Sequence, residues 1–408
     1  MPHMNEEFLL QIFASRPQPL RIALVTETYP PEINGVAMTL GRQVSDLQKR
    51  GHQIQLIRLR QGALDIAIHN EQFEEVLQMG VPIPRYPGLK IGLPAKAALL
   101  RLWKLKRPDV VHIATEGPLG WSALTAAQAL RLPVSTDFHT NFHSYSQHYG
   151  ASWLRRPILA YLRKFHNKAG VTMVPTEGVR RALQAHGYRN LEVVSRGVDV
   201  ELFHPDKRDA ALRASWGAQT DTQVVLYVGR VAPEKNLALV FQAYAAMHAI
   251  NPNSRLVIVG DGPARQMLQT KHPDVLFCGM HTHEDLARHY ASGDVFLFPS
   301  MTETYGNVTA EAMASGLAVV AYHYAAAEVL IRHGENGMTA AYNDELAFVT
   351  AATALAQDPM RARKMGMNSR HTAGSISWDG VHERFECILQ TILETEARSG
   401  KTELAVDW

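Results

Sequence analysis

The chain has 408 residues, of which 46% are hydrophobic and 20% charged; this composition is typical of a globular protein long enough for two domains and excludes a disordered one. Its formal net charge of +2 gives no global field that would recruit nucleic acid, so an anionic partner must meet a local patch. The two cysteines, Cys278 and Cys387, form neither a zinc spacing nor a disulfide framework, which favours a reducing compartment.

The N-terminal segment lacks the features of an export signal. Glu6 and Glu7 stand where a signal peptide carries basic residues, and the apolar stretch after them is short. No run reaches the roughly 18–20 apolar residues of a membrane-spanning helix. We therefore expect a cytoplasmic protein, with peripheral attachment to the inner face of the plasma membrane as the only mode of membrane contact.

Short apolar runs alternate with helical patterns along the whole chain. Continuous β-branched runs are typical of strands that are buried on both faces, as in parallel sheets covered by helices. The alternation predicts doubly wound α/β units. The expected strands are residues 21–25, 53–58, 110–113, 133–136 and 171–174 in the first half, and residues 224–228, 255–259, 275–278, 295–298 and 317–320 in the second.

The turn after the first strand contains Asn34-Gly35. A glycine there lets the backbone approach a ligand where any side chain would block it. Asn-Gly is also a common plain turn, so this dipeptide alone favours neither interpretation. The turn is not the Gly-x-Gly-x-x-Gly of nicotinamide dehydrogenases, and no such motif occurs elsewhere, which argues against that class.

Two segments combine basic and apolar residues at helical spacing, residues 90–107 and residues 151–168. Such helices can lie on an anionic lipid surface. Their alternative is a helix whose apolar side faces the core and whose basic face is solvated. The apolar positions are Leu99, Leu100, Leu102 and Trp103 in the first segment and Leu154, Ile158, Leu162 and Phe165 in the second; the basic ones include Arg101, Lys104, Lys106, Arg107, Arg155, Arg156, Arg163, Lys164 and Lys168.

A polar, ring-rich cluster follows the fourth expected strand, from Ser135 to Tyr149. Side chains at the carboxyl end of a strand project towards the ligand edge of an α/β sheet. His139 lies closest to the strand end, so we select it as a candidate ligand contact. A single histidine in such a position is often structural.

In the second half, the run Gly229-Arg230 and the pair Glu234-Lys235 follow a strand. Arginine offers a bidentate fork for phosphate and lysine a point charge, both at the ligand edge of the sheet. The alternative is a solvated loop whose cations pair with Glu234. Gly262, after the next strand, lies in a tight turn that suits either a nucleotide or plain chain reversal.

The most informative segment runs from residue 294 to residue 321 and is expected to form a strand, a turn at Gly306 and a helix. Glu303 precedes the helix and Glu311 is expected about two turns along it. A helix N-terminus holds anions, and carboxylates accept hydroxyls. Because a sugar joined to a diphosphate is a nucleotide-sugar, this spacing points to such a ligand.

No metal or cofactor site is expected. The chain has no Asp-x-Asp, no His-Glu-x-x-His and no set of cysteine ligands. Arg230, Lys235 and the amides of a helix N-terminus can neutralise a departing diphosphate without a metal.

Taken together, these residues resemble the retaining glycosyltransferases of the GT-B fold in family four, also called glycosyltransferase group 1. The most specific part is Glu303 with Glu311 and the following Ala-Met-Ala-Ser-Gly316; Gly229-Arg230 with Glu234-Lys235 comes next. The first turn and the stretch from Arg196 to Pro205 are similar to mannosyl- and glucosyltransferases that act on lipids. One departure is residues 324–328, Tyr-Ala-Ala-Ala-Glu, where family members often carry Gly-Gly.

The resemblance implies two Rossmann-like domains facing a cleft. They are an acceptor-binding domain of residues 1–195 and a nucleotide-sugar-binding domain of residues 196–377. Residues 378–408 form a helix and tail that return to the N-terminal domain.

The resemblance also implies roles for individual residues. Arg230 and Lys235 bind the diphosphate, Glu311 the ribose hydroxyls and Glu303 the hydroxyls of the hexose, while His139 contacts the sugar from the opposite domain. The catalytic candidates are thus His139, Arg230, Lys235 and Glu303. The donor-binding candidates are Gly35, Gly229, Arg230, Lys235, Gly262, Glu303, Thr304, Tyr305, Gly306, Asn307, Val308 and Glu311.

The expected reaction is hexose transfer from a nucleotide diphosphate-sugar to an acceptor hydroxyl with retained configuration. GDP-mannose is the first donor candidate and a UDP-hexose the second; a membrane lipid is the first acceptor candidate. The alternatives are an epimerase or phosphorylase on the same scaffold and a non-catalytic nucleotide-sugar-binding protein. Release of free nucleotide only in the presence of an acceptor would argue against the first alternative.

Overall fold

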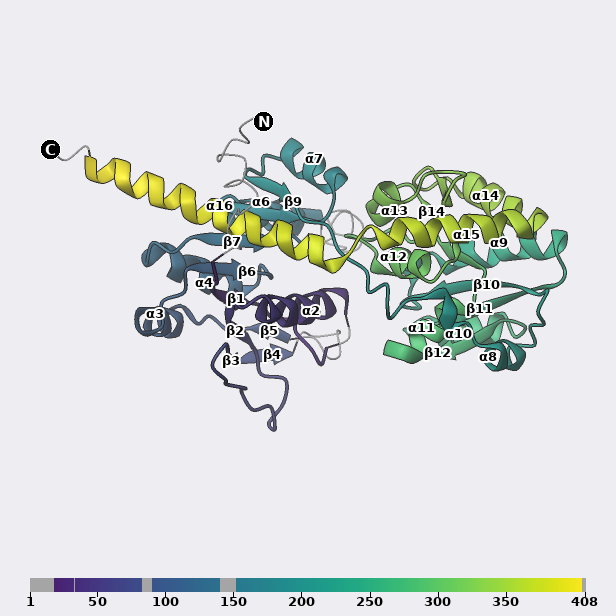
Figure 1. The fold of residues 1–408 in the computed structure, drawn as a ribbon, viewed down its shortest axis with the longest axis horizontal. Helices are drawn as coiled ribbons and strands as arrows, with labels where there is room; N and C mark the ends of the chain where they lie inside the picture. Colours follow the sequence, from purple (N-terminus) through teal and green to yellow (C-terminus); the bar gives the residue numbers. More distant parts are fainter. Residues whose placement is uncertain (1–17, 33, 83–89, 140–151, 406–408) are drawn as a thin grey trace, which may run out of the picture.

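The computed structural model describes residues 18–32, 34–82, 90–139 and 152–405, with the side chains of residues 156–395 in the last range. Two parallel sheets lie side by side in the long direction of the molecule, each covered by helices, and a long C-terminal helix begins near the boundary between them and runs along the first half (Figure 1). None of the described helices is both long and apolar enough to cross a bilayer.

The first sheet has seven strands in the order β3-β2-β1-β6-β7-β8-β9. All of its neighbouring pairs are parallel, so the strands end at a common edge. A short antiparallel ribbon, β4 and β5, is attached to it. The elements are β1 Arg21–Val25, α2 Gly35–Lys49, β2 Gln53–Leu59, β3 Phe73–Gln78, β4 Gly80–Pro82, β5 Lys90–Gly92, α3 Lys96–Leu105, β6 Val110–Ile113, α4 Pro118–Ala129, β7 Val134–Asp137, α6 Ser152–His166, β8 Val171–Val174, α7 Glu177–Ala185 and β9 Leu191–Val193.

The second sheet has six parallel strands in the order β12-β11-β10-β13-β14-β15. Its elements are α8 Ala210–Ser215, β10 Gln223–Val228, α9 Leu237–Ile250, β11 Ser254–Val259, α10 Arg265–Lys271, β12 Leu276–Gly279, α11 His283–Ala291, β13 Val295–Phe298, α12 Asn307–Ala314, β14 Ala318–Tyr322, α13 Ala325–Leu330, β15 Gly337–Ala340, α14 Glu345–Gln357 and α15 Pro359–Gly374, with short 3-10 turns at Pro205–Lys207 and Pro233–Lys235.

Strand β1 shows how the first sheet is buried on both faces. Ala23 and Val25 pack into one apolar cluster with Trp103 of α3. Ile22 and Leu24 point to the other face, because side chains alternate along a strand, and they pack into a second cluster. Each of these strand side chains is fully buried. This explains why the strands appear in the sequence as continuous apolar runs rather than alternating ones.

The last helix, α16 Trp378–Ala405, joins the two halves. It follows α15 of the second half and runs across to the first sheet (Figure 1). Phe385 and Leu389 of α16 lie in the same cluster as Ile22 and Leu24, and Glu386 accepts from Arg50 Nε at 2.8 Å. The expected GT-B arrangement, including the return of the C-terminal helix to the N-terminal sheet, is therefore confirmed.

Ten strands were expected, and all ten are present with ends shifted by at most a few residues. Five further strands were missed: β3, β9 and β15, and the two strands β4 and β5 of the short ribbon. The first three lie at edges of the two sheets. Strands β3 and β9 bury few residues there, whereas β15, Gly-Met-Thr-Ala, is largely buried but contains no continuous run of large apolar residues. Strand β3, Phe-Glu-Glu-Val-Leu-Gln, buries only its first and third residues.

The two basic segments form α3 and α6, whose apolar sides face the core. Leu99 and Trp103 of α3 are fully buried, as is Phe165 of α6. The basic residues Arg101 and Lys104 are exposed. The side chains of Leu154 and Arg155 lie outside the described residues. This is the arrangement given above as the alternative to a lipid-facing helix, and it leaves the basic faces open.

Candidate functional site

Turns that follow β10, β11 and β13 form the edge of the second sheet at which donor contacts were predicted, and we call it the donor edge. The first two turns approach each other so closely that they require glycine. A Cβ on Gly260 would lie 2.0 Å from the carbonyl oxygen of Gly229, and one on Gly262 would lie 2.4 Å from that of Val231. Both positions have positive φ, 134° and 159°. Backbone packing therefore accounts for Gly262 without any ligand, and its predicted donor contact stays a prediction.

The turn after β13 leads into α12 through Gly306, whose φ of 88° lies in the left-handed region that favours glycine. No side chain caps the helix at this residue. The amide of Thr309 donates to the carbonyl of Gly306 at 3.0 Å. The amides of Asn307 and Val308 before it have no acceptor within the helix and can bind an anion. Because α12 begins at Asn307, Glu311 lies just over one turn along it, and the expected two turns were wrong.

Lys235 and Glu303 form an ion pair between Nζ and Oε1. They lie 68 positions apart in the chain and come together because β10 and β13 are neighbours in the sheet. Their side chains are 17% and 15% exposed. Ser300 Oγ also donates to Glu303 Oε1 at 2.7 Å. The loop alternative, in which the cations pair with Glu234, therefore does not hold for Lys235, although it does hold for Arg230.

Tyr324 anchors the backbone beside this pair. The amide of Glu303 donates to the Tyr324 hydroxyl at 3.1 Å, and that hydroxyl donates to the carbonyl of Ser300 at 2.6 Å. Burial, followed by the nearby carboxylate of Glu303, raises the pKa of Tyr324 well above its usual range. The hydroxyl therefore stays protonated and neutral. Tyr324 begins the stretch that departs from the Gly-Gly pattern, so at this point a side chain supports the turn.

Glu311 has a different environment from Glu303. The Tyr290 hydroxyl donates to its Oε2 at 2.9 Å. Burial raises the pKa of Glu311 to about 7, and the hydrogen bond from Tyr290 offsets this only in part. Among the described side chains, no Lys or Arg pairs with it. Within the part of the chain that the structure describes, Glu311 is thus a carboxyl group without a compensating positive charge.

Arg230 points outward, with 57% of its side chain exposed and its Nη1 3.5 Å from Glu234 Oε1. Its carbonyl accepts from the Tyr227 hydroxyl at 3.0 Å, which ties the backbone of the loop to β10. The guanidinium is therefore available to a ligand at the open side of the donor edge.

On the opposite half, Gly35 begins α2, which is capped by Asn34. Asn34 Oδ1 accepts from the amides of Val36 and Ala37 at 3.1 and 2.9 Å. A Cβ on Gly35 would have Asn307 Nδ2 as its nearest atom, at 4.0 Å. The N-termini of α2 and α12 therefore face each other across the boundary between the two halves.

His139 lies at the same boundary. Its carbonyl accepts from Thr304 Oγ1 at 3.0 Å, so the predicted histidine meets the predicted turn. Its Nδ1 lies 2.9 Å from Arg196 Nη2. Because a guanidinium only donates, Nδ1 accepts and a neutral ring carries its proton on Nε2, which faces Asp137 Oδ2 at 3.2 Å.

Asp137, His112 and Arg196 were not predicted as site residues, yet Asp137 and Arg196 contact His139, and His112 contacts Asp137. Asp137 lies between His139 and His112, whose Nε2 is 3.3 Å from Oδ2. Burial by itself would raise the pKa of Asp137, but the two imidazoles hold it well below its usual range. Asp137 is the last residue of β7, and His139 lies two residues after it. Its place at the end of a strand is therefore the feature of the sequence from which Asp137 could have been predicted.

Arg196 is buried in the segment that joins the two halves, at 6% exposure. Burial lowers its pKa, and the charge of Asp137 acts in the opposite direction. It pairs with Thr39 Oγ1, and its own carbonyl accepts from the Tyr305 hydroxyl at 3.1 Å. Tyr305, predicted only for its backbone amide, thus joins the donor turn to the segment between the halves. Asp137, His139 and Arg196 line a small cavity that is closed by Trp378 and Phe385 of α16.

The remaining predicted donor residues lie on the same turn. Thr304 and Gly306 are partly buried there, as are Asn307 and Val308 at the start of α12. Gly229 follows β10 with a φ of 153°. The structure therefore brings all of the predicted residues to two facing edges, while their individual roles stay predictions.

Comparison with known proteins identifies both halves. Residues 33–202 match the family described as Glycosyltransferase Family 4, and residues 222–358 match Glycosyl transferases group 1. A GDP-mannose-dependent alpha-mannosyltransferase of Corynebacterium glutamicum is 32% identical over 92% of this chain and 88% of its own. An alpha-monoglucosyldiacylglycerol synthase of Streptococcus pneumoniae is 27% identical over 74% of this chain and 71% of its own.

Solved structures share the fold at low identity. Sucrose-phosphate synthase from Thermosynechococcus elongatus aligns with a TM-score of 0.74 at 20% identity, over 92% of this chain and 99% of its own. The Anabaena protein HepE, in complex with UDP and glucose, aligns with a TM-score of 0.71 at 19% identity, over 91% of this chain and 100% of its own. At such identities the likeness concerns the fold alone.

Proposed function

This chain is a hexosyltransferase of glycosyltransferase family 4 and group 1, and we propose that it transfers mannose from GDP-mannose to a hydroxyl of a membrane lipid with retained configuration. A UDP-hexose is the second donor candidate.

The contact between Lys235 and Glu303 is the observation that carries the proposal. In a nucleotide-sugar the anomeric carbon of the hexose is bonded to the terminal phosphate. A cation for the phosphate and a carboxylate for the sugar hydroxyls must therefore lie next to each other. Lys235 and Glu303 meet this requirement in the partly buried turn beside the N-terminus of α12.

The choice of donor rests on relatives. Three proteins named GDP-mannose-dependent alpha-mannosyltransferase are 31–34% identical to this chain, with coverage of 74–92% of it. Guanine and uracil nucleotides share the diphosphate, so the residues described above would serve either donor.

In the proposed reaction the bond between the hexose and the phosphate breaks while the acceptor oxygen attacks the same face. Lys235, Arg230 and the first amides of α12 stabilise the leaving diphosphate, and an oxygen of that phosphate takes the proton of the acceptor hydroxyl. Glu303 orients the sugar rather than acting as a base, because Lys235 and Ser300 already engage its carboxylate. His139 completes the site when the two halves close.

A lipid acceptor is supported by one relative named for a diacylglycerol product and by the exposed basic faces of α3 and α6. Arg101 and Lys104 of α3, together with Lys164 of α6, are exposed. Anionic headgroups attract such residues by about 1 kcal/mol each near the surface. We place the protein at the inner face of the plasma membrane on this basis.

The first experiment identifies the donor. Thermal shift with GDP-mannose, UDP-glucose, GDP and UDP should show the largest stabilisation with GDP-mannose, because a ligand that binds only the folded state raises the Tm. Transfer is then assayed with lipid extracts, and the anomeric configuration of the product is read by NMR. Preference for a UDP-sugar, or an inverted product, would overturn the corresponding part of the proposal.

The second experiment tests whether the basic face of α3 binds an anionic membrane surface. Flotation with vesicles that contain anionic lipid is compared between the wild type and the double variant Arg101→Glu, Lys104→Glu. Lys271→Glu, an exposed change on the other half, is the control. Binding that is lost only in the double variant supports the assignment. Absence of binding by the wild type, or equal binding by all three proteins, would contradict it.

A further inference from the structure

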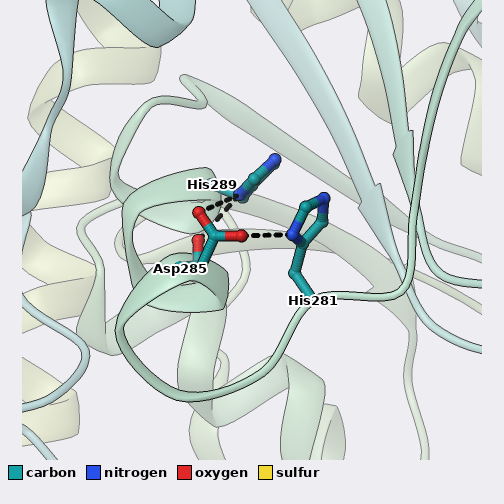
Figure 2. A group of neighbouring side chains, drawn as sticks. All are labelled: His281, Asp285 and His289. Carbon is teal, nitrogen blue, oxygen red and sulfur yellow. Dashed lines mark hydrogen bonds and ion pairs between the residues drawn. The ribbon is translucent and has the colours of Figure 1, made fainter.

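Three potential metal ligands gather outside the transfer site, at the turn between β12 and α11 (Figure 2). They are His281, Asp285 and His289, spaced four residues apart, and one ligand atom of each lies within 4.8 Å of the others. His281 precedes the helix, while Asp285 and His289 lie on one side of it. The turn ends at the same sheet edge as the donor turns, but none of the three residues is among those assigned to the donor.

The ring of His281 directs one nitrogen at Asp285. Its Nε2 lies 3.1 Å from the carbonyl oxygen of Cys278. A carbonyl only accepts, so this nitrogen carries a proton and donates. The other nitrogen, Nδ1, is in contact with Asp285 Oδ2. In the neutral ring, Nδ1 therefore has no proton, and its lone pair faces a carboxylate oxygen. Because both atoms are acceptors, their contact requires a proton or a cation between them.

His289 completes the group. Its ring stacks on that of His281, with centroids 4.0 Å apart and an interplanar angle of 26°. Its Nδ1 lies 2.7 Å from the backbone carbonyl of Asp285 and 3.9 Å from Oδ1 of the same residue. Figure 2 shows this nitrogen turned towards Asp285 beside that of His281.

We propose that His281, Asp285 and His289 bind a divalent transition cation of the zinc class. Imidazole nitrogens with one carboxylate are a ligand set typical of Zn²⁺ and Co²⁺, whereas Mg²⁺ and Ca²⁺ prefer oxygen ligands alone. The hydrogen bond from His281 Nε2 to the carbonyl of Cys278 is the outer contact that commonly orients a metal-bound histidine.

The ligand atoms must come somewhat closer together to bind one ion. Zinc bonds of about 2.0–2.2 Å place tetrahedral ligand atoms roughly 3.3–3.5 Å apart. His281 and Asp285 can supply the movement because their side chains are 24% and 48% exposed. The side chain of His289 is only 4% exposed, so we expect it to keep its position. On binding, its Nδ1 contacts the ion in place of its hydrogen bond to the carbonyl of Asp285.

One neighbouring charge opposes the ion. Arg288 Nη1 lies 3.5 Å from Asp285 Oδ1, but the guanidinium is mainly engaged by Asp209, at 2.5 Å from Nη2. We therefore expect Arg288→Ala to strengthen the binding of the ion. The site is independent of the proposed transfer. Its effect would be to brace the end of β12, where the carbonyl of Gly279 accepts from the amide of Gly260 at 2.7 Å.

The test is a titration of the full-length protein with Zn²⁺ in competition with a chromophoric chelator, repeated with Co²⁺ to record its ligand-field absorption. The chain has 19 histidines, so the comparison between variants decides the outcome. Asp285→Asn and His281→Ala should each weaken binding by at least about tenfold. His283→Ala removes an exposed histidine of the same turn and should leave the affinity unchanged.

Thermal unfolding without metal verifies that each variant is folded. If His281→Ala is unstable, Asp285→Asn alone decides the outcome, because asparagine has nearly the same shape as aspartate. One tight equivalent of Zn²⁺ that is lost with Asp285→Asn and kept with His283→Ala supports the site. The proposal is overturned if the wild type binds no tight equivalent, if Asp285→Asn binds as the wild type does, or if Mg²⁺ competes with equal strength.

Discussion

The two halves of this enzyme build their polar sites differently. On the second sheet, Lys235 and Glu303 are partly exposed and come from two turns of neighbouring strands. On the first sheet, Asp137 and His139 follow β7, and Arg196, which follows β9, donates to His139. The charges on the second sheet therefore pair directly within one sheet, whereas on the first sheet the carbonyls of His139 and Arg196 also accept hydrogen bonds from the other half.

This difference bears on how the reaction is controlled. Thr304 and Tyr305 of the donor turn bond to the carbonyls of His139 and Arg196. These two hydrogen bonds join the turn after β13 to the first half, so we expect a movement of the halves to shift this turn and His139 together. Nucleotide binding should survive damage to these boundary contacts, and transfer should not. Each prediction below tests that separation.

The largest effect is expected at the pair on the donor edge. Lys235→Ala should lower kcat about 100- to 1000-fold, because it removes a charge that stabilises the leaving diphosphate. Glu303→Gln should also be impaired. The double variant should lose much less than the product of the two single losses, since the residues act as one unit. Steady-state kinetics on the three variants measure this, and fully independent effects would show that the pair does not operate jointly.

The next effect is at the boundary. Arg196→Met should reduce turnover about 100-fold by misplacing His139, while the affinity for GDP changes little. Arg42→Met is a matched control, because Arg42 pairs with Asp46 and with Asp199 of the same segment. Calorimetry with GDP and a transfer assay separate the two quantities. If Arg196→Met lowers the affinity for GDP as much as it lowers turnover, nucleotide binding depends on the contacts at the boundary.

A smaller loss is expected for Arg230→Ala. Charge-assisted hydrogen bonds are worth about 1.5–3 kcal/mol, so the affinity for the diphosphate should fall at least about tenfold. The stability of the fold should stay within about 0.5 kcal/mol, as is usual for exposed residues. Arg332→Ala, whose side chain is 83% exposed in the same half, is the control in nucleotide titration and thermal unfolding. Unchanged nucleotide affinity would exclude Arg230 from the diphosphate site.

The smallest effect is a pH dependence of donor binding. Burial raises the pKa of Glu311 from 4.5 to about 7, so the carboxylate that we predict to accept ribose hydroxyls forms as the pH rises through that value. Donor affinity should increase by up to about tenfold between about pH 6 and pH 8. Glu311→Gln should remove this dependence, which calorimetry at several pH values would show.

The contribution of Glu311 to the stability of the fold changes with pH in the opposite direction to donor binding. Its pKa is higher in the folded than in the unfolded protein, so its stabilising contribution is present below about pH 4.5 and is lost as the pH rises through about 7. Thermal unfolding of the wild type and Glu311→Gln across this range separates the effect on the fold from the effect on donor binding. A flat binding profile in the wild type would contradict the assignment.

Much of the architecture is determined by local sequence. Ten strands were predicted because burial on both faces requires continuous apolar runs, and the helix at Trp378 was implied by the family resemblance. The edge strands β3 and β9 were missed because they bury few residues, and β15 was missed because its buried residues, Gly-Met-Thr-Ala, form no continuous run of large apolar side chains. The turns at Gly229, Glu303 and Gly306 were found for the same local reason, since strand, glycine and charge follow one another directly in the chain.

Tertiary structure alone decided which charges meet. Lys235 pairs with Glu303 rather than with the adjacent Glu234 because neighbouring strands of a parallel sheet end at one edge. Arg196 reaches His139 because the strands that they follow, β9 and β7, end at the same edge of the first sheet. Sequence spacing holds no information on contacts between residues so far apart in the chain. The sequence by itself therefore determined the two sheets and the residues at their edges, while packing decided how those residues are paired and charged.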